Sequence, residues 1–206
     1  MRWRNVFSTD QTDDTTTLWN VYLDKMHPHL NICENKTVLE IGPFNGAHTQ
    51  VIKSHNPKKI TLVELASDAL FRLRNDFPDC EIIEDDIFHY LEQARGFDVV
   101  VCCGVLYHFH SPLHLLELIV NRISPTYICI ETFPSGNDAI NIEDDNTPGA
   151  RQLLDGWRSA NISIKLPKET IITAMKNLGY RIHTRDDTLT KPNSPELILF
   201  CVFEKI

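Results

Sequence analysis

The sequence lacks the features of a protein that is exported or inserted into a membrane. Its apolar runs stay well short of the ~20 residues that a transmembrane helix requires. Its first residues, MRWRNVFSTD, carry two arginines but no apolar stretch of the kind found in a signal peptide. We therefore expect a cytoplasmic protein with no membrane contact.

Cysteine pairs with the spacing of metal or redox sites are missing as well. The six cysteines never occur as C-x-x-C, and most lie in or beside apolar runs, so buried thiols explain them better than disulfides or zinc. An excess of basic residues is also absent, since the net charge is −8. An acidic surface repels the phosphate backbone, which disfavours nonspecific binding of nucleic acid.

The chain also lacks the glycine spacing of a dinucleotide site. After an apolar run the sequence continues IGPFNG (41–46), whose two glycines allow a sharp turn and a close approach of backbone. Phe44 stands where the G-x-G-x-x-G pattern has its middle glycine. A pyrophosphate group needs bare backbone at that point, so Phe44 argues against a dinucleotide cofactor.

Short apolar runs alternate with helix-like stretches from residue 37 onward. Five such runs are apolar on both faces, which is typical of a parallel sheet covered by helices on both sides. Two more apolar runs follow near the C-terminus, and the connection between them is too short for a parallel crossover. The sequence therefore predicts an α/β, Rossmann-like, seven-stranded sheet that is mostly parallel, with the last strand antiparallel. The predicted strands are 37–42, 60–65, 80–85, 97–104, 126–132, 180–185 and 196–203.

Carboxylates follow the second and third predicted strands. Glu64 ends the second strand, about 20 residues beyond the glycine turn, where a carboxylate can accept hydrogen bonds from two ribose hydroxyls. The third strand ends in Glu84-Asp85-Asp86, where a carboxylate can accept from the amino group of adenine. Because ligands of such sheets bind at the carboxyl ends of the strands, we expect a pocket for an adenosine without phosphates.

These motifs together resemble those of class I S-adenosylmethionine-dependent methyltransferases over about residues 37–132. The resemblance is carried by VLEIGPFNGAHT, by the two carboxylates that follow the next strands, and by FDVVVCCGVLYHF. It implies methyltransferase activity with S-adenosyl-L-methionine as the cofactor. It also implies the cofactor-binding residues, which are Glu40, Gly42 and Gly46 at the methionine part with Pro43 and Phe44 in the same turn, Glu64 at the ribose, Asp86 and Ile87 at the adenine, and the backbone of Cys103 and Gly104 at the methionine amino group.

A closer similarity is to the tRNA wobble-uridine (5-oxyacetic acid) carboxymethyltransferase-like group. GVLYHFHSPLHLL, the ETF at 131–133, Trp157 and LPKETIITAMKNLGY carry it. Members of that group use a carboxylated S-adenosylmethionine on tRNA. Their basic N-terminal region and their carboxylate-binding lysine have no counterpart that we can match here. We therefore expect ordinary S-adenosylmethionine and a small-molecule acceptor, with tRNA possible but not favoured.

Tyr107 and His108 follow the fourth predicted strand, where the donor methyl group should lie. We predict both as catalytic residues, with His108 taking a proton from the acceptor and Tyr107 orienting it. The alternative for His108 is a residue that only positions its loop. The spacing His108-x-His110 can ligate a metal, but no carboxylate is near in sequence, so we expect no metal site.

Two other functions stay open at this point. One is tRNA wobble-uridine methyl or carboxymethyl transfer, and the other is a non-catalytic module that binds a nucleoside. Binding of tRNA would need a basic face on the protein. The candidate residues for it are Arg2, Arg4, Lys53, Lys58 and Lys59.

We expect a single methyltransferase domain over residues 1–206, acting as a monomer or homodimer. Residues 1–35 form an N-terminal helical cap, 36–132 the S-adenosylmethionine-binding core, 133–166 an irregular lid or insert, and 167–206 a C-terminal helix and strand pair. The acceptor would lie between Trp19 and Tyr22 of the cap, Tyr107-His108 and the insert, with Trp157 closing the lid.

Overall fold

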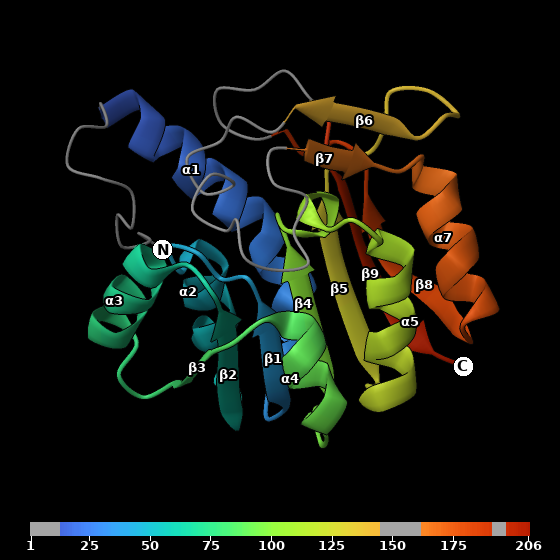
Figure 1. Ribbon diagram of the computed structural model, residues 1–206. Coiled ribbons are helices and arrows are strands. Elements are labelled where there is room, and N and C mark those ends of the chain that lie inside the picture. Colours follow the sequence, from blue (N-terminus) through green and yellow to red (C-terminus); the bar gives the residue numbers. More distant parts are fainter. Residues whose placement is uncertain (1–12, 145–161, 191–196) are drawn as a thin grey trace.

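A computed structural model describes residues 13–144, 162–190 and 197–206 (Figure 1). Its centre is a seven-stranded sheet in the order β3-β2-β1-β4-β5-β9-β8, which confirms the predicted α/β fold. The strands are β1 (Thr37–Ile41), β2 (Lys59–Glu64), β3 (Glu81–Glu84), β4 (Val99–Cys103), β5 (Tyr127–Thr132), β8 (Tyr180–Asp186) and β9 (Leu199–Lys205).

The direction of the strands also agrees with the prediction. The pairings among β1 to β5 are all parallel, whereas β9 pairs antiparallel with β5 on one side and with β8 on the other. β9 is thus the strand that runs against the rest of the described sheet. Between β8 and β9, an isolated antiparallel bridge pairs Thr190 with Leu197.

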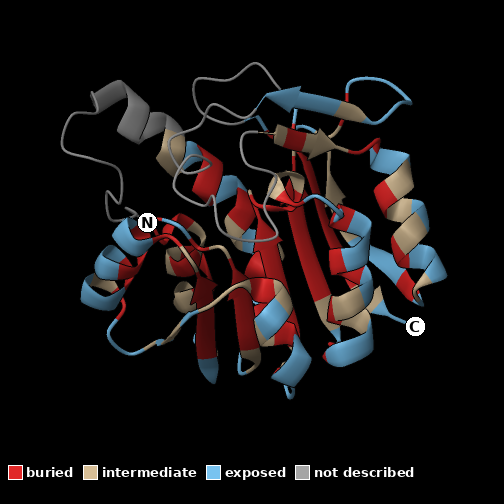
Figure 2. Ribbon diagram, in the orientation of Figure 1, coloured by how far each residue is buried: buried red, intermediate tan, exposed pale blue. Residues whose placement is uncertain are grey.

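Helices cover both faces of the sheet, which explains why the central strands are apolar throughout (Figures 1 and 2). All five residues of β4 are buried. One core lies under α1 (Asp13–Met26), η1 (His27–Cys33), α2 (Ala47–Ser54) and α3 (Ser67–Asp76). A second core on the other face lies under α4 (Ile87–Gln93), α5 (Pro112–Arg122) and α7 (Lys168–Asn177).

The region 133–166 contains more regular structure than the sequence predicts. β6 (Asn141–Asp144) and β7 (Ile162–Lys165) pair antiparallel as a separate two-stranded ribbon. The ribbon lies at the end of the sheet where β5 ends, in the upper part of Figure 1. The prediction of an irregular insert was therefore wrong for these two segments, and Trp157 lies outside the described residues.

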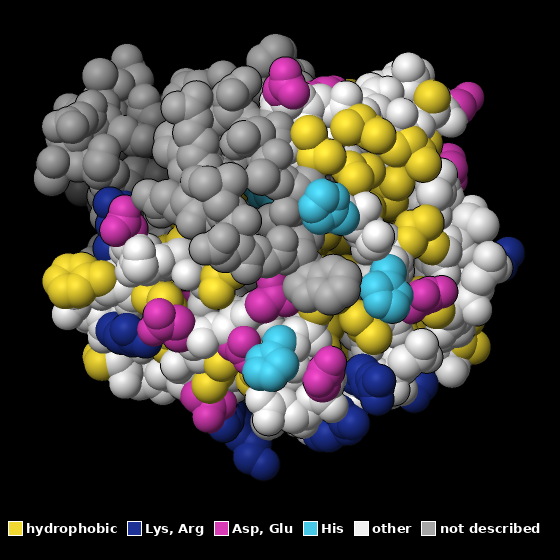
Figure 3. Space-filling model, in the orientation of Figure 1, with side chains coloured by type: hydrophobic (Ala, Val, Ile, Leu, Met, Phe, Trp, Pro, Cys, Tyr) yellow, Lys and Arg dark blue, Asp and Glu magenta, His cyan; other side chains and the backbone are white. Residues whose placement is uncertain are grey.

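Basic side chains gather along one border of the molecule. On the face shown in Figure 3, most Lys and Arg side chains lie along the lower border, where the parallel strands begin. The opposite edge, where these strands end, is the edge that binds ligands in such sheets. Among the described residues, no helix is long and apolar enough to cross a membrane.

Candidate functional site

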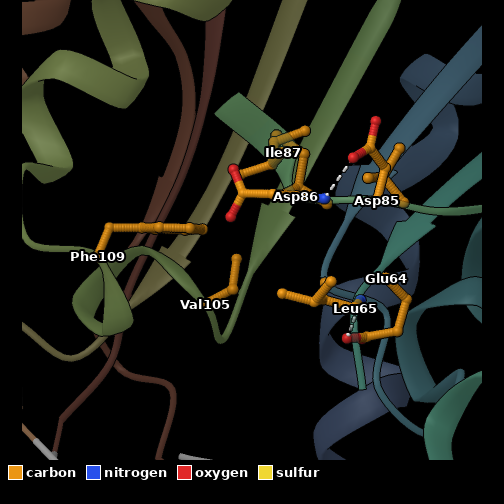
Figure 4. Close-up of a pocket in the computed structure, with 10 residues that line it drawn as sticks. Glu64, Leu65, Asp85, Asp86, Ile87, Val105 and Phe109 are labelled. Carbon is orange, nitrogen blue, oxygen red and sulfur yellow. Dashed lines mark hydrogen bonds between the residues drawn. The ribbon is translucent and has the colours of Figure 1, made fainter. Parts of the chain in front are cut away.

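A cleft lies where the first four strands of the sheet end. Its empty space is about 290 Å³, which includes space open to solvent. Figure 4 shows Glu64 and Leu65 on one side, Val105 and Phe109 on the other, and Asp86 between them. The lining residues are Ile41, Gly42, Val63, Glu64, Leu65, Asp85, Asp86, Ile87, Val105 and Phe109.

The turn after β1 has a left-handed backbone at three alternate positions. Gly42, Phe44 and Gly46 have φ values of 62°, 51° and 76°. Glycine adopts this conformation freely, whereas for another L-residue it costs about 1–2 kcal/mol. Phe44 therefore occupies the middle position of the glycine pattern and keeps a glycine-like backbone, with its own side chain 53% exposed. Replacement of the middle glycine by Phe44 therefore adds a side chain to the turn, while the backbone keeps the conformation that a glycine would adopt.

Glu64 holds the turn after β1 and the start of α3 together. Its carboxylate accepts hydrogen bonds from the backbone N–H of Phe44 at 2.9 Å, of Leu65 at 2.8 Å and of Ala66 at 2.9 Å. The residue is 3% exposed and lines the cleft. Besides the predicted position at the cleft, Glu64 thus has a structural part that the sequence did not predict.

Asp85 and Asp86 come from the loop between β3 and α4. Asp86 caps α4, since its carboxylate accepts a hydrogen bond from the backbone N–H of Phe88 at 2.8 Å. Asp85 accepts from the backbone N–H of Asp86 and contacts the His89 ring at 2.8 Å. The bond to Asp85 raises the pKa of His89. Asp85, Asp86 and Ile87 all line the cleft.

Glu40 is buried beneath the glycine turn rather than exposed to the cleft. It is 1% exposed, and the Thr49 hydroxyl donates to its carboxylate at 2.7 Å. Loss of hydration raises the pKa of Glu40 to about 8. Its carboxyl is therefore mostly protonated at neutral pH and fixes α2 against β1 through Thr49.

Cys103 and Gly104 end β4 next to the turn after β1. Burial raises the pKa of the Cys103 thiol, which lies 3.8 Å from the Cys129 thiol. Gly104 has a φ of 71°, and its backbone N–H donates to the Glu131 carbonyl of β5 at 2.9 Å. The end of β4 is thus tied to the end of β5.

Tyr107 and His108 lie in a short helical turn, η2 (Leu106–His108), directly after β4. The Tyr107 ring centre is 4.2 Å from that of His108 and 5.3 Å from that of Phe133. The Lys165 ammonium of β7 lies 5.8 Å from the centre of the Phe133 ring and pairs with Glu143 at 2.7 Å. The η2 turn therefore contacts the segment after β5 and the β6–β7 ribbon.

The structure brings some of the predicted residues together and leaves others outside the cleft lining. Gly42, Glu64, Asp86 and Ile87 line the cleft. Sequence analysis missed Val105 and Phe109, which flank η2 on either side and form the wall opposite Glu64. The remaining predicted residues are adjacent in the chain or beneath the cleft: Glu40, Pro43, Phe44, Gly46, Cys103, Gly104, Tyr107 and His108.

The sequence predicts that Tyr22 contacts the acceptor, but the structure buries this residue. Its side chain is only 2% exposed and belongs to the core under α1 and α2, whereas Trp19 is half-buried beside it. The described residues contain no cluster of three His, Cys, Asp or Glu side chains that could hold a metal ion.

Comparison with known proteins identifies the family. A family model described as a methyltransferase domain matches residues 19–185. The chain belongs to this family. The match covers the whole cleft and all predicted site residues of this methyltransferase domain.

Curated relatives share only part of their length with the chain. It is 33% identical over 114 residues to the tRNA U34 carboxymethyltransferase of Nautilia profundicola, which covers 52% of this chain and 35% of that protein. It is 26% identical over 170 residues to the tRNA U34 carboxymethyltransferase of Pseudoalteromonas atlantica, which covers 77% of this chain and 48% of that protein. The chain thus spans less than half the length of either relative.

Solved structures of methyltransferases share the fold. The N-terminal domain of EvdMO1 with SAH bound has a TM-score of 0.67 and 18% identity, covering 98% of this chain and 91% of that one. Magnesium protoporphyrin IX methyltransferase (ChlM) of Synechocystis PCC 6803 with bound SAM has a TM-score of 0.69 and 11% identity, covering 100% and 90%. At these low identities the likeness concerns the fold.

Proposed function

We propose that the chain transfers the methyl group of S-adenosylmethionine to a small-molecule acceptor. The observation that carries this proposal is the cleft at the carboxyl ends of the strands, where the glycine turn, Glu64 and the Asp85-Asp86 pair meet. Membership of the methyltransferase domain family supports it.

The residues of the cleft suit a nucleoside that carries no phosphate. Three acidic residues line it, and their negative charge would repel a pyrophosphate. Carboxylates instead accept hydrogen bonds from ribose hydroxyls and from the adenine amino group, which we assign to Glu64 and to Asp86 with Ile87 beside it. The methionine part would lie along the turn at Gly42, Pro43, Phe44 and Gly46, above Glu40 and beside Cys103 and Gly104.

The bound donor supplies an electrophilic methyl carbon on a positively charged sulfur. The protein must align the acceptor with this carbon and exclude water. We propose that Tyr107 and His108 form the acceptor side of the site, since η2 lies between two residues that line the cleft, Val105 and Phe109. Tyr107 would orient the acceptor, with Phe133 packed against its ring.

A small acceptor fits the charge distribution better than tRNA does. Lys58 directly precedes β2 and Lys59 is its first residue. Both therefore lie at the edge of the sheet where the parallel strands begin, opposite the cleft. Lys53 pairs with Asp79, and Lys59 pairs with Glu81 at 2.9 Å. The other basic candidates lie outside the described residues. The curated relatives modify tRNA, so tRNA wobble-uridine modification is the second candidate.

Calorimetric titration tests the donor site. We would titrate the protein with S-adenosylmethionine, S-adenosylhomocysteine and the carboxylated donor. We expect the two uncarboxylated nucleosides to bind, and Glu64→Gln to weaken them by about tenfold, equivalent to about 1.4 kcal/mol. The amide keeps the shape of Glu64 and one acceptor oxygen, so the variant retains part of the bonding to the turn.

Glu92→Gln is the matched control, because it removes the same charge from an exposed position on α4. Preference for the carboxylated donor would favour the tRNA-type reaction over simple methyl transfer. Absence of binding by all three nucleosides would contradict the proposed function.

A further inference from the structure

Three polar side chains meet beneath the carboxyl edge of the sheet, outside the residues that line the cleft. They are Tyr22 of α1, His48 of α2 and Glu131 of β5. The His48 Nε2 atom is 3.5 Å from the Tyr22 hydroxyl and 3.9 Å from a carboxylate oxygen of Glu131. The Glu131 carboxylate also lies beside the Tyr22 hydroxyl. Three elements that are far apart in the sequence thus build one cluster.

Glu131 places this cluster next to the donor site. It pairs in register with Cys103 of β4, and its backbone carbonyl accepts from the N–H of Gly104. Its side chain is 0% exposed. A carboxylate that is removed from water in this way needs a charge partner or hydrogen-bond donors, and His48 and Tyr22 stand in those positions.

His48 is the member of the cluster that reaches the surface. Its side chain is 12% exposed, compared with 2% for the Tyr22 residue and none for Glu131. It lies in the first turn of α2, two residues after Gly46 closes the glycine turn. His48 therefore comes directly after the turn that we assign to the methionine part of the donor.

The groups that face His48 come from two other elements of the fold. Glu131 faces it from β5 and Tyr22 from α1, while the thiols of Cys103 and Cys129 lie beside them. Burial keeps the Tyr22 hydroxyl protonated, because it raises the pKa of this group well above its usual value. Glu40 of β1 is bound to Thr49, the next residue of α2. A histidine backed by a buried carboxylate is an arrangement that accepts a proton and stabilises the resulting imidazolium.

We propose that His48 accepts the proton that the methyl acceptor loses, with Glu131 and Tyr22 as positioning residues. The inference rests on the proposed methyl transfer. The acceptor's electron pair forms the bond to the methyl carbon, the electrons of the broken carbon–sulfur bond stay on sulfur, and the proton passes to the imidazole of His48. His108 would then hold η2 in place beside the acceptor and would not take the proton.

Nuclear magnetic resonance can test this without a known acceptor. The sulfonium of S-adenosylmethionine carries one positive charge, whereas the thioether of S-adenosylhomocysteine is neutral. A proton acceptor near the methyl group feels this charge, so its pKa should be lower in the complex with S-adenosylmethionine. We would titrate the imidazole signals of both complexes, with His48 and His108 assigned through His48→Asn and His108→Asn.

We expect the pKa of His48 to be about one unit lower with S-adenosylmethionine than with S-adenosylhomocysteine, and the pKa of His108 to change less. A change in His48 that is equal to or smaller than that in His108 would overturn the inference. If neither nucleoside binds, the proposed function fails together with this inference. Binding without the expected change in His48 overturns the inference alone.

Variants of the positioning residues give a second readout. Glu131→Gln should lower the pKa of His48 by about one unit, because the imidazolium loses its charge partner. Tyr22→Phe keeps the ring in the core and should lower it less. An unchanged pKa of His48 in both variants would contradict the parts assigned to Glu131 and Tyr22. The comparison of the two nucleosides uses the wild-type protein and does not depend on the folding of either variant.

Discussion

Single carboxyl groups at this site do different work because of their surroundings. Glu64 accepts three backbone hydrogen bonds at the edge of the cleft. Glu40 accepts a hydrogen bond from one hydroxyl group and is buried away from water. Both residues end or nearly end a strand, so the sequence pattern treats them alike. What separates them is the number of donors that the folded chain places around each carboxyl.

The raised pKa of Glu40 makes stability depend on pH. Below about pH 4.5 the residue is protonated in both the folded and the unfolded state, so it has no effect on their difference. Between about 4.5 and about 8 the unfolded state loses the proton while the folded state keeps it, so the folded state becomes less stable as pH rises. Above about pH 8 both states have lost the proton, so Glu40 lowers the stability no further.

Glu40→Gln should therefore stabilise the protein more at about pH 8.5 than at about pH 5. The amide oxygen can still accept from Thr49 and carries no charge. Each kcal/mol of added stability should raise the melting temperature by about 2–4 °C for a domain of this size. Thermal unfolding of both proteins at the two pH values measures the effect. Equal differences at the two pH values would mean that Glu40 is ionised in the folded protein.

At the scale of elements, the turn between β1 and α2 is held by contacts on two sides. A side chain at Gly46 would meet the Phe77 ring, at the end of α3, with 2.2 Å between the added Cβ and the nearest carbon. The backbone at Gly46 also has a φ of 76°. Gly46 thus lets α2 start close to α3, which keeps the turn at the edge of the cleft.

Gly46→Ala should destabilise the protein by about 2–4 kcal/mol, because it combines left-handed backbone strain with the clash against Phe77. Gly96→Ala is the matched control. Gly96 has nearly the same φ, 79°, but nothing lies within 4 Å of its added Cβ. Urea unfolding of both variants separates the two contributions. A loss of stability for Gly46→Ala no larger than that for Gly96→Ala would show that Phe77 moves aside without cost.

At the scale of the whole molecule, the sheet separates the ligand edge from the basic border. The parallel strands end together at the cleft, and most Lys and Arg side chains on the face in Figure 3 lie where the strands begin. With a net charge of −8, the chain offers little attraction to a polyanion at the edge where a wobble base would have to enter.

A gel-shift assay with a tRNA transcript at about 50 mM salt should therefore show no complex with this chain. The acidic net charge and the ion pairs of Lys53 and Lys59 are the physical reason. A shift that disappears in Lys53→Glu and Lys58→Glu would contradict the small-acceptor proposal. It would move tRNA modification to first place.

The order of apolar runs predicted the sheet, because a strand that is buried on both faces consists of consecutive apolar residues. The antiparallel last strand followed from the length of one connection. The glycine turn and the carboxylates after β2 and β3 were also visible, because parallel strands bring their ends to one edge in any such fold. The β6–β7 ribbon was missed since its strands have four residues each, partly polar, and find each other across a long connection.

The sequence by itself determined the fold class, the edge of the sheet where the cleft lies, and four of the residues that line it, Gly42, Glu64, Asp86 and Ile87. Tertiary structure alone decided that Glu40 is buried, that Val105 and Phe109 form the far wall, and that Tyr22 faces inward. It also decided that His48 and Glu131, 83 positions apart, meet at 3.9 Å. Local patterns record which face of an element is apolar, whereas contacts between α1, α2 and β5 depend on how whole layers pack.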